Sequence, residues 1–339
     1  MNNILIVTNS PGGGGAERAM HLLANILHDH GFPIVVVQVN KEGKDSVELR
    51  SGVHNLGRDH KSGALSLLIA ISRFRRCVQC YKPRVLVLNC DLPELLALFL
   101  PSDIPLIVVE HANPAWSTRK LLGRLVRFLH NRRNTTFIAV SDHLKIWPKM
   151  LAPSSVNENL VLTDNDFKVK SSGPIKRLLF VGRLASIQKR PEVVLEISAA
   201  MSMPVVFVGH GPALPSLQSV ANNLSIQAVF IGFMEDPWSV METGDLLIVP
   251  SKFEGDGLVV VEAIARRIPI LLSDIPDFRR FNLNERNYCV DLEGFISRVT
   301  ENKDNVAGLI VSETLTGSIL ESRAPTAVLM KWKKVFESF

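Results

Sequence analysis

Apolar runs without polar alternation are the feature that most constrains how this chain can fold. A strand with one solvated face alternates apolar and polar residues, whereas a strand covered on both faces is apolar throughout. Most β-type runs here, such as Ile4–Thr8 and Leu246–Val249, are of the second kind, and longer helix-type segments separate them. The other runs are Pro33–Val39, Val85–Leu88, Ile104–Val109, Thr136–Val140, Leu178–Val181, Val205–Val208, Ala228–Ile231 and Pro269–Leu272. This order predicts an α/β fold with parallel sheets that helices cover on both faces.

The length and the similar layout of the two halves indicate two domains. At roughly 150 residues per domain, a chain of 339 residues holds about two. The polar stretch Val161–Gly173 lies between the halves and is typical of a linker. We therefore predict one Rossmann-like domain in residues 1–165 and a second in residues 174–323. The basic helical segment 324–339 is expected to pack back on the first domain.

Positive charge is concentrated in the first half of the chain. Residues 1–165 carry 19 Lys and Arg against 13 Asp and Glu, whereas the remainder carries 19 against 20. The first domain should therefore face an anionic partner. At this stage membrane lipid, a phosphorylated substrate and nucleic acid are all open.

Cysteine use and the lack of targeting patterns lead us to expect a cytosolic protein that could touch a membrane from that side. Met1–Asn3 leads directly into an apolar strand, without the basic segment and cleavage site of a signal peptide. No apolar run reaches the roughly 18 residues that a membrane span needs. Cys77 and Cys80 are spaced C-x-x-C but lack the second pair that a zinc site requires. We expect free thiols and no metal site.

A glycine-rich turn follows the first strand and opens a helix. Glycines let the backbone approach a ligand closely, and a helix N-terminus favours anions. Glu17 stands where the dinucleotide fingerprint needs glycine or alanine, and no Lys-Ser/Thr pair completes a P-loop. Taken alone, the turn with Gly14 and Gly15 is equally consistent with a structural turn and with a ligand-binding loop.

The strongest signal lies in the segment PSKFEGDGLVVVEA that follows the strand ending at Val249. Glu254 lies in the turn, Gly255 and Gly257 free the backbone there, and Glu262 follows about a turn and a half inside a helix. The helix start offers free N–H groups and a dipole to a phosphate, and each carboxylate can accept hydrogen bonds from sugar hydroxyls. A ligand with hydroxyls at both ends and phosphates between them would use every part. The alternative is a solvated glutamate pair beside a tight turn.

Two cations and a second glycine pair follow strands of the second half. Arg183 leaves the end of the first strand there, and Lys189 comes from the following loop. Ligands of open α/β sheets bind beyond the carboxyl ends of strands, where two cations suit a diphosphate. Gly209 and Gly211 end another strand at the same edge, where a base or ribose could lie against bare backbone. Surface salt bridges and an ordinary loop are the respective alternatives.

One histidine of the first half is placed for chemistry. His111 follows the expected strand Ile104–Val109 and Glu110, so it lies at the carboxyl edge of the sheet. A histidine there can donate or accept a proton near neutral pH. A structural histidine is the other interpretation.

Together these motifs resemble glycosyltransferase family 4. Gly-Gly-Ala-Glu-Arg, the strand-terminal histidine, Gly-Arg-Leu followed by lysine, Gly-x-Gly-Pro and Glu-x7-Glu occur in the family's order from Ile4 to about Asp277. The resemblance implies a GT-B fold, in which two Rossmann-like domains face each other across a cleft. It implies a retaining enzyme that moves a hexose from a nucleotide-sugar, most commonly a UDP-sugar, to a lipid-linked or polysaccharide acceptor. It further implies a role in lipopolysaccharide, capsule or glycolipid assembly, without a metal or other cofactor.

The resemblance also implies a role for each matched residue. Glu254 would bind the donor hexose and Glu262 the ribose. Arg183 and Lys189 would hold the diphosphate and stabilise the leaving nucleotide, and His111 would touch the transferred sugar or the reacting centre. Further donor contacts would come from Gly14, Gly15, Gly209, Gly211, Gly255, Asp256, Gly257 and Leu258.

The chain departs from the family pattern in three places. Arg183 and Lys189 are one residue further apart than usual, which makes Arg190 the alternative second cation. The Pro-Asn-Gly segment that usually precedes the linker is missing near Asn159–Thr163. Asp256 adds a negative charge beside the expected sugar, where it either shapes donor choice or points into solvent.

The segment Arg119–Arg133 combines many basic residues with a helical spacing of leucines. This pattern is typical of a helix that lies on an anionic membrane. A lipid-linked acceptor would explain it, together with the cluster Arg73, Arg75 and Arg76 and the positive first domain. The alternative is an ordinary core-facing helix with solvated arginines.

Three other functions compete with a glycosyltransferase. Another enzyme of the same fold, such as a nucleotide-sugar epimerase, would change the donor without an acceptor; a phosphorylase would need a pyridoxal lysine, for which there is no signature. A nucleic-acid-binding protein would interleave aromatic with basic residues, but only Trp116 and Phe128 qualify near the basic segment. We therefore expect no nucleic-acid partner. An inactive sugar-binding relative is disfavoured by the glutamate pair.

Overall fold

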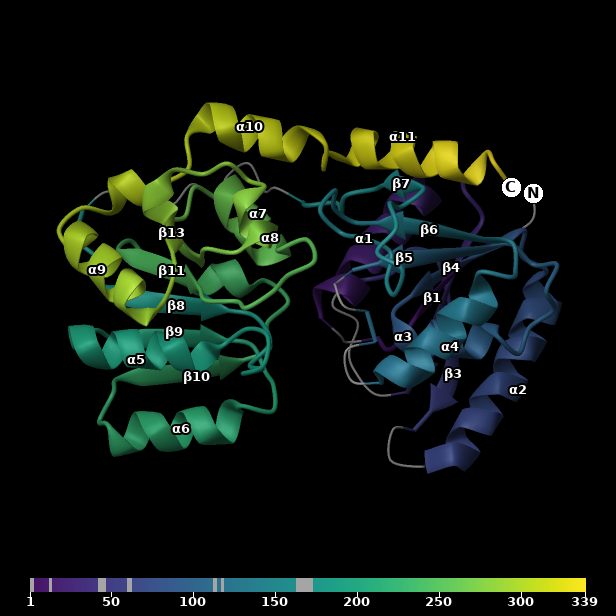
Figure 1. Ribbon diagram of the computed structural model, residues 1–339, viewed down its shortest axis with the longest axis horizontal. Helices are drawn as coiled ribbons and strands as arrows, with labels where there is room; N and C mark the ends of the chain where they lie inside the picture. Colours follow the sequence, from purple (N-terminus) through teal and green to yellow (C-terminus); the bar gives the residue numbers. More distant parts are fainter. Residues whose placement is uncertain are drawn as a thin grey trace. The chain divides into compact units, whose positions relative to one another are not determined.

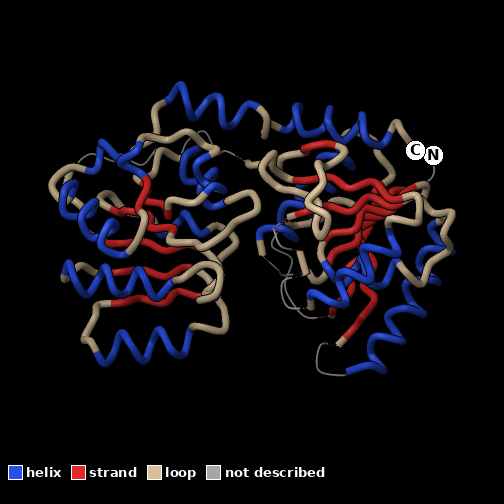
Figure 2. Tube along the Cα trace, viewed as in Figure 1, coloured by secondary structure: helices blue, strands red, loops and turns tan. Residues whose placement is uncertain are grey.

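The chain forms two compact units, shown in Figure 1. The first unit comprises residues 1–160 together with 323–339, and the second unit comprises residues 161–322. In each unit a central sheet lies between layers of helices, as Figure 2 shows. The computed structural model describes residues 3–11, 14–41, 47–59, 63–111, 115–116, 119–162 and 173–339. Most of the expected linker, residues 163–172, therefore lies outside the described residues.

The first unit is built on a seven-stranded parallel sheet with the order β3-β2-β1-β4-β5-β6-β7. Its strands are β1 Ile4–Thr8, β2 Ile34–Asn40, β3 Gly52–Arg58, β4 Val85–Asn89, β5 Leu106–Glu110, β6 Thr135–Ala139 and β7 Ser155–Val156. The strand order reverses between β1 and β4, which is the topological switch point of a doubly wound sheet. Every residue of β1, β2, β4 and β5 is buried, as the apolar runs require.

Helices cover both faces of this sheet. They are α1 Gly15–Asp29, α2 Gly63–Tyr81, α3 Asp91–Ala97, α4 Lys120–His130 and α11 Pro325–Phe336. On one face α1 and α11 share a core in which Trp332 and Phe336 pack with Leu23 and Ile6. On the other face α2 and α3 bury side chains such as Phe74 against the sheet, and α4 packs beside α3. The C-terminal helix thus belongs to the first unit.

The second unit is built on a six-stranded parallel sheet with the order β10-β9-β8-β11-β12-β13. Its strands are β8 Arg177–Val181, β9 Val205–Val208, β10 Ala228–Gly232, β11 Asp245–Val249, β12 Ile270–Ser273 and β13 Tyr288–Cys289. Its α-helices are α5 Pro191–Met201, α6 Leu214–Asn223, α7 Leu258–Ala265, α8 Pro276–Arg279, α9 Leu292–Asn302 and α10 Glu313–Glu321. Short 3-10 helices cover Pro237–Val240, Glu285–Asn287 and Val306–Leu309. Separate cores on the two faces again give a three-layer unit.

The predicted α/β class with two parallel sheets is confirmed. Each expected strand is present, with bounds that differ by at most two residues. Three strands were missed. Gly52–Arg58 is a partly exposed edge strand rich in polar residues and glycine, so it lacks the apolar signature. Ser155–Val156 and Tyr288–Cys289 are two-residue edge strands, too short to have a pattern.

The cysteines are free, as expected. Burial raises the pKa of the Cys77 thiol and that of the Cys289 thiol to about 12. Among the described residues, no group of three His, Cys, Asp or Glu side chains is arranged to hold a metal ion. No helix in that part of the chain combines the length and the hydropathy that are needed to cross a bilayer.

Candidate active site

Glu254 lies in the turn between β11 and α7, and three contacts hold it there. Its Oε1 accepts a hydrogen bond from Ser251 Oγ at 2.7 Å and forms an ion pair with Lys189 Nζ at 2.5 Å. Its backbone N–H donates to Asp277 Oδ2 at 2.7 Å. Glu254 is only 6% exposed, and its Oε2 makes no hydrogen bond to another described residue. A carboxylate with one oxygen anchored and the other available is suited to accept a ligand hydroxyl.

The two candidates for the second cation make different contacts. Lys189 reaches Glu254 with a side chain that is 20% exposed. Arg190 instead donates from Nε to the carbonyl oxygen of Pro250 at 2.6 Å and from Nη2 to Ser273 Oγ at 3.1 Å. Arg190 therefore ties strand ends together, and Lys189 is the cation beside the turn.

Hydrogen bonds between two loops bring Lys189 to this turn. The N–H of Lys252 donates to the carbonyl oxygen of Gln188 at 2.8 Å. The side-chain amide of Gln188 donates to the carbonyl oxygen of Phe253 at 3.3 Å. The loop after β8 is thus fixed to the loop after β11, although the residues are more than 60 positions apart in the sequence.

Arg183 and the second glycine pair lie at the ends of the neighbouring strands β8 and β9. A Cβ atom at Gly209 would lie 1.9 Å from the carbonyl oxygen of Gly182, and one at Gly211 would lie 2.3 Å from that of Leu184. These glycines are therefore required by the close approach of two loops, a reason that the sequence did not reveal. The side chain of Arg183 is exposed beside them and makes no ion pair with a described residue.

Helix α7 starts at this edge of the sheet. Gly257 is its N-cap with a φ of +61°, and Leu258 is its first residue. The first N–H groups of a helix have no intrahelical acceptor, so they offer donors and a positive dipole end to an anion. Glu262 lies further along α7, is 7% exposed, and accepts a hydrogen bond on Oε2 from Trp238 Nε1 at 3.0 Å. The indole of Trp238 orients this carboxylate, and no local sequence signal marked that residue.

Asp256 does not point into solvent. Its side chain is 2% exposed, and Arg280 Nη2 donates at 2.6 Å both to Asp256 Oδ1 and to the Asp256 carbonyl oxygen. The interpretation as a solvated carboxylate is therefore wrong. The neighbouring Gly255 is buried in the same turn.

The glycine loop of the first unit is described only from Gly14 onwards, because Gly12 and Gly13 lie outside the described residues. Gly14 is the N-cap of α1, and its N–H donates to Glu17 Oε2 at 3.0 Å. A carboxylate at this position caps the helix and complements its dipole. Glu17, the residue that departs from the dinucleotide fingerprint, thus caps the helix at Gly14. Gly15 is the first residue of the helix.

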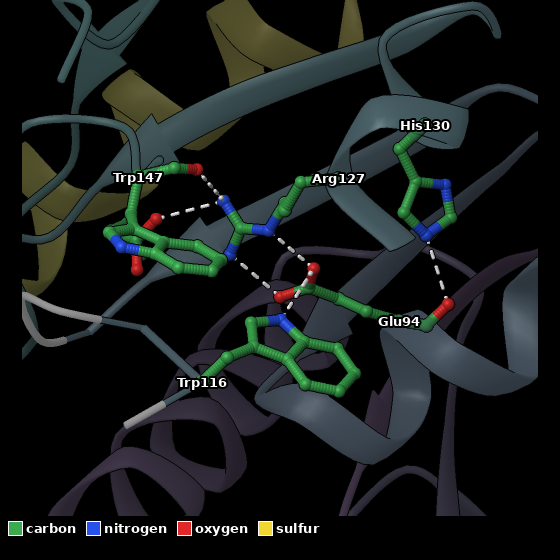
Figure 3. A network of polar contacts seen from close by, with 6 residues as sticks. Glu94, Trp116, Arg127, His130 and Trp147 are labelled. Atoms are coloured by element: carbon green, nitrogen blue, oxygen red, sulfur yellow. Dashed lines mark hydrogen bonds and ion pairs between the residues drawn. The ribbon is translucent and has the colours of Figure 1, made fainter. Parts of the chain in front are cut away.

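His111 directly follows Glu110, the last residue of β5. Glu110 belongs to a buried network centred on Arg127 of α4, shown in Figure 3. Arg127 Nη1 donates to Glu110 Oε2 at 2.9 Å, while its Nε and Nη2 donate to the two carboxylate oxygens of Glu94 at 2.5 and 2.8 Å. Trp116 Nε1 donates to the same carboxylate at 3.3 Å. The network fixes the end of β5, from which the backbone of His111 departs.

Burial dominates the electrostatics of this network. The side chains of Arg127, Glu94 and Glu110 are each 2% exposed. Desolvation raises the pKa of Glu110 to about 7, although Arg127 acts to lower it, and desolvation also raises the pKa of Glu94. The pKa of His130, whose Nε2 bonds the Glu94 carbonyl oxygen at 2.9 Å, falls to about 4 through burial. Two carboxylates facing one guanidinium carry excess negative charge, which a proton relieves.

Helix α4 presents apolar side chains outward. Arg127 and His130 are buried, whereas Leu121 is 83%, Leu125 55% and Phe128 51% exposed. The opposite side of the helix faces a core, where Val126 is buried with Trp116 and Trp147 and Leu122 packs against them. The outward surface is also basic. Lys120 is the first residue of α4, and Arg132 follows shortly after its end, with its guanidinium 3.6 Å from the centroid of the Phe128 ring. The exposed basic residues on this surface are Arg119, Lys120, Arg124 and Arg132.

Comparison with known proteins covers both units. Residues 13–147 match the family model described as Glycosyltransferase Family 4, and residues 175–308 match the model described as Glycosyl transferases group 1. The chain belongs to glycosyltransferase family 4. The resemblance inferred from the motifs is thus confirmed, and the protein is a transferase enzyme.

Within the aligned parts, curated relatives are about one quarter identical to this glycosyltransferase. Alpha-D-kanosaminyltransferase of Streptomyces kanamyceticus is 23% identical over 69% of this chain and 68% of the relative. Sulfoquinovosyl transferase of Arabidopsis thaliana is 24% identical over 62% of this chain and 46% of the relative. Phosphatidyl-myo-inositol mannosyltransferase of Mycobacterium tuberculosis is 27% identical over 57% of this chain and 54% of the relative. The matches thus span about half of the length of the second and third relatives.

Solved structures share the fold of the glycosyltransferase over nearly its whole length. Sucrose-phosphate synthase from Thermosynechococcus elongatus has a TM-score of 0.80 at 13% identity, covering 100% of this chain and 99% of that one. A TarM variant of S. aureus in complex with fondaparinux, alpha-GlcNAc-glycerol and UDP has a TM-score of 0.76 at 12% identity, covering 99% and 100%. HepE of Anabaena in complex with UDP has a TM-score of 0.72 at 14% identity, covering both chains fully. The predicted GT-B fold class is confirmed.

Proposed function

We propose that the enzyme transfers a sugar from a nucleoside diphosphate donor to a hydroxyl of a lipid-linked or polysaccharide acceptor in cell-surface glycan synthesis. The observation that carries this proposal is the turn at the start of α7. Glu254 keeps Oε2 available while Lys189 and Ser251 hold its Oε1, and the helix N-terminus begins four residues later. The free carboxylate oxygen can accept a hydrogen bond from a sugar hydroxyl, and the nearby cation and helix dipole can bind phosphate. This combination suits a neutral sugar joined to a diphosphate.

The diphosphate is assigned to two cations of the second unit. Lys189 has three N–H donors, so it can hold Glu254 and a phosphate oxygen together. Arg183 supplies an exposed fork-shaped guanidinium at the end of β8, of the shape that binds phosphate oxygens in pairs. Uridine is proposed as the base because two solved structures of this fold, TarM and HepE, contain UDP.

The reaction is proposed to retain the anomeric configuration by front-face attack. The acceptor hydroxyl oxygen bonds to the anomeric carbon on the side from which the diphosphate oxygen departs, and that phosphate oxygen takes the hydroxyl proton. Negative charge then grows on the departing diphosphate. Lys189, Arg183 and the N-terminus of α7 stabilise this charge, which is the largest catalytic contribution that fixed groups can make. Because these groups supply positive charge, we expect transfer without a divalent metal.

His111 is proposed to contact the transferred sugar or the reacting centre. Its position supports this role, because it follows β5 at the carboxyl edge of the sheet, where open α/β sheets bind ligands. The ion pair of Glu110 with Arg127 holds the preceding residue in place.

The outward surface of α4 is proposed to rest on anionic lipid. Its exposed leucines and Phe128 can enter the headgroup region, while the surrounding arginines and lysine attract negative headgroups. A lipid-linked acceptor would then be presented to the enzyme at the bilayer surface. The enzyme should co-sediment with vesicles containing phosphatidylglycerol at low salt, and the double variant Leu125→Ser, Phe128→Ser should bind them more weakly. Leu224→Ser, an exposed leucine of the second unit, is the matched control. Equal binding by all three proteins would contradict the proposal.

Thermal unfolding with a nucleotide panel tests the donor assignment. UDP, GDP, UDP-glucose, UDP-galactose, UDP-N-acetylglucosamine and GDP-mannose are the probes, and at least one should raise the unfolding temperature. Glu262→Ala should weaken nucleotide binding, whereas Glu254→Ala should mainly abolish transfer because it removes the contact to the reacting sugar. Product analysis without an acceptor separates an epimerase, which would alter the donor alone. A panel that leaves the unfolding temperature unchanged throughout would refute the donor assignment.

A further inference from the structure

The segment after β12 forms hydrogen bonds to the turn that contains Glu254. Two charged side chains make these bonds, and neither was among the site residues predicted from the sequence motifs. Asp277, in α8, accepts the backbone N–H of Glu254 on Oδ2 at 2.7 Å. Arg280, directly after α8, donates from Nη2 to the carbonyl oxygen and to Oδ1 of Asp256, each at 2.6 Å. One short segment thus contacts the turn on both sides of Gly255.

A third contact comes from the apolar side chain between these two residues. Phe278 is fully buried, and a Cβ atom at Gly257 would lie 3.2 Å from its Cε1. Gly257 has a φ of +61°, a conformation that glycine adopts without strain. Glycines on both sides of Asp256 leave the turn few local constraints, so its conformation depends on these tertiary contacts.

Charge explains why an arginine holds Asp256. The Asp256 side chain is 2% exposed and that of Arg280 is 13% exposed. A buried carboxylate without a cation is costly, and here it would add an uncompensated negative charge two residues from Glu254. A single guanidinium nitrogen, Nη2, donates both to this carboxylate and to the carbonyl oxygen of the same residue, which fixes the direction of the peptide as well as the side chain.

We propose that Asp277 and Arg280 are positioning residues that hold the 254–257 turn so that the Glu254 carboxylate meets the transferred sugar. This inference rests on the proposed function, because it requires Glu254 to bind that sugar. Glu254 is then held at its carboxylate by Ser251 and Lys189 and at its backbone by Asp277. Displacement of a reacting geometry by about 1 Å can lower a rate by about 100-fold.

Variants at these two positions should separate transfer from nucleotide binding. Arg280→Met and Asp277→Ala should each lower kcat by about 10- to 100-fold for the best donor of the six-member panel. The affinity for UDP should stay within about twofold, because UDP lacks the sugar that the turn positions. Arg280→Lys keeps the charge but loses the fork, so it should recover part of kcat.

Arg279→Met is the matched control. Arg279 lies next to Arg280, but it pairs with Asp274 at 2.5 Å and with Glu285 at 2.5 Å rather than with the turn. Its variant should keep kcat within about twofold of the wild type. The double variant Asp256→Asn, Arg280→Gln removes both charges together, so it leaves no unpaired buried carboxylate and serves if Arg280→Met does not fold. It should show the same fall in kcat.

The experiment measures kcat and KM for transfer, Kd for UDP by calorimetry, and the thermal unfolding temperature of every variant. A fall in kcat with unchanged UDP affinity and partial rescue by Arg280→Lys supports the proposal. A kcat within twofold of the wild type, or a parallel loss of UDP affinity, would overturn it and leave the segment a structural support. If wild-type enzyme uses no donor of the panel and binds neither UDP nor GDP, the proposed function fails, and this inference fails with it.

Discussion

Each unit buries carboxylates beside a cation, but the two clusters differ in how completely their neighbours enclose them. In the first unit Arg127, Glu94 and Glu110 have side chains that are 2% exposed, and each nitrogen of the guanidinium donates inside the network. In the second unit Lys189 is 20% exposed, and Glu254 Oε1 is the acceptor it contacts among the described residues. The first cluster is saturated internally, whereas the second retains a carboxylate oxygen and ammonium donors for another molecule.

This difference distinguishes a structural cluster from a ligand site. A fully enclosed charge must find all its partners within the protein, so it fixes the positions of the segments that supply them. Arg127 joins α3, β5 and the segment of Trp147, whose carbonyl oxygen accepts a hydrogen bond at 3.3 Å. A partly enclosed pair has weaker structural demands and more capacity for a ligand. Changes to the first cluster should therefore affect stability, and changes to the second should affect activity.

The largest expected effect is on the stability of the first cluster. Arg127→Met leaves two buried carboxylates without a cation, so we expect the free energy of unfolding to fall by about 3–5 kcal/mol. Urea unfolding measures this loss. Arg124→Met, an exposed residue of the same helix, is the matched control and should change the free energy of unfolding by less than about 0.5 kcal/mol. A loss below about 1 kcal/mol for Arg127→Met would mean that the network does not fix the fold.

The second largest effect is expected on the rate of sugar transfer when the second cluster is changed. Lys189→Met removes a cation from the departing diphosphate, so kcat should fall by about 100- to 1,000-fold, while the protein stays folded. Steady-state transfer kinetics and thermal unfolding measure the two quantities. Lys252→Met, an exposed lysine of the adjoining loop, is the control and should leave kcat unchanged. If Lys189→Met lost stability but kept its transfer rate, the second cluster would be structural, contrary to our expectation.

The fold was largely readable from the sequence because its dominant signal is local. A parallel strand that helices cover on both faces must be apolar over a short run, and Ile4–Thr8 or Leu246–Val249 need no distant information to be recognised. The edge strand Gly52–Arg58 escaped because edge positions tolerate polar residues and glycine. The positions of strand ends followed from the strands, which is why Glu254, Lys189 and His111 could be placed at sheet edges.

The hydrogen-bond partners of the site residues could not be predicted from the sequence, because these partners come from distant segments. Trp238 meets Glu262, and Arg280 meets Asp256, across 24 residues each. The helical pattern of the segment Arg119–Arg133 suggested arginines in solvent, yet Arg127 is buried because Glu94 and Glu110 enclose it. Such pairings need the tertiary structure, since any exposed arginine has the same local sequence signature.

The smallest expected effect is a pH dependence of stability that belongs to the first cluster. Burial raises the pKa of Glu110 from 4.5 to about 7, so between these values the folded state binds the proton more tightly than the unfolded state. This group then lowers stability progressively as pH rises from about 4.5 to about 7, and adds no further change above. His130, with a pKa lowered to about 4, acts in the opposite direction between about pH 4 and pH 6.5.

Comparison with Glu110→Gln isolates the contribution of Glu110, because His130 is present in both proteins. The stability of the wild type relative to the variant should fall by about 1–3 kcal/mol between pH 4.5 and pH 7. Urea unfolding at several pH values measures this difference. A difference that stays constant over that range would show that Glu110 does not titrate there.

A crystal structure of the enzyme with UDP would locate the diphosphate itself, on which the roles of Lys189 and of the N-terminus of α7 depend. We expect the diphosphate at the N-terminus of α7, with Lys189 Nζ within hydrogen-bond distance of a phosphate oxygen and the Asp277 contact to the Glu254 backbone intact. UDP bound away from that turn, with Lys189 contacting no phosphate oxygen, would contradict it.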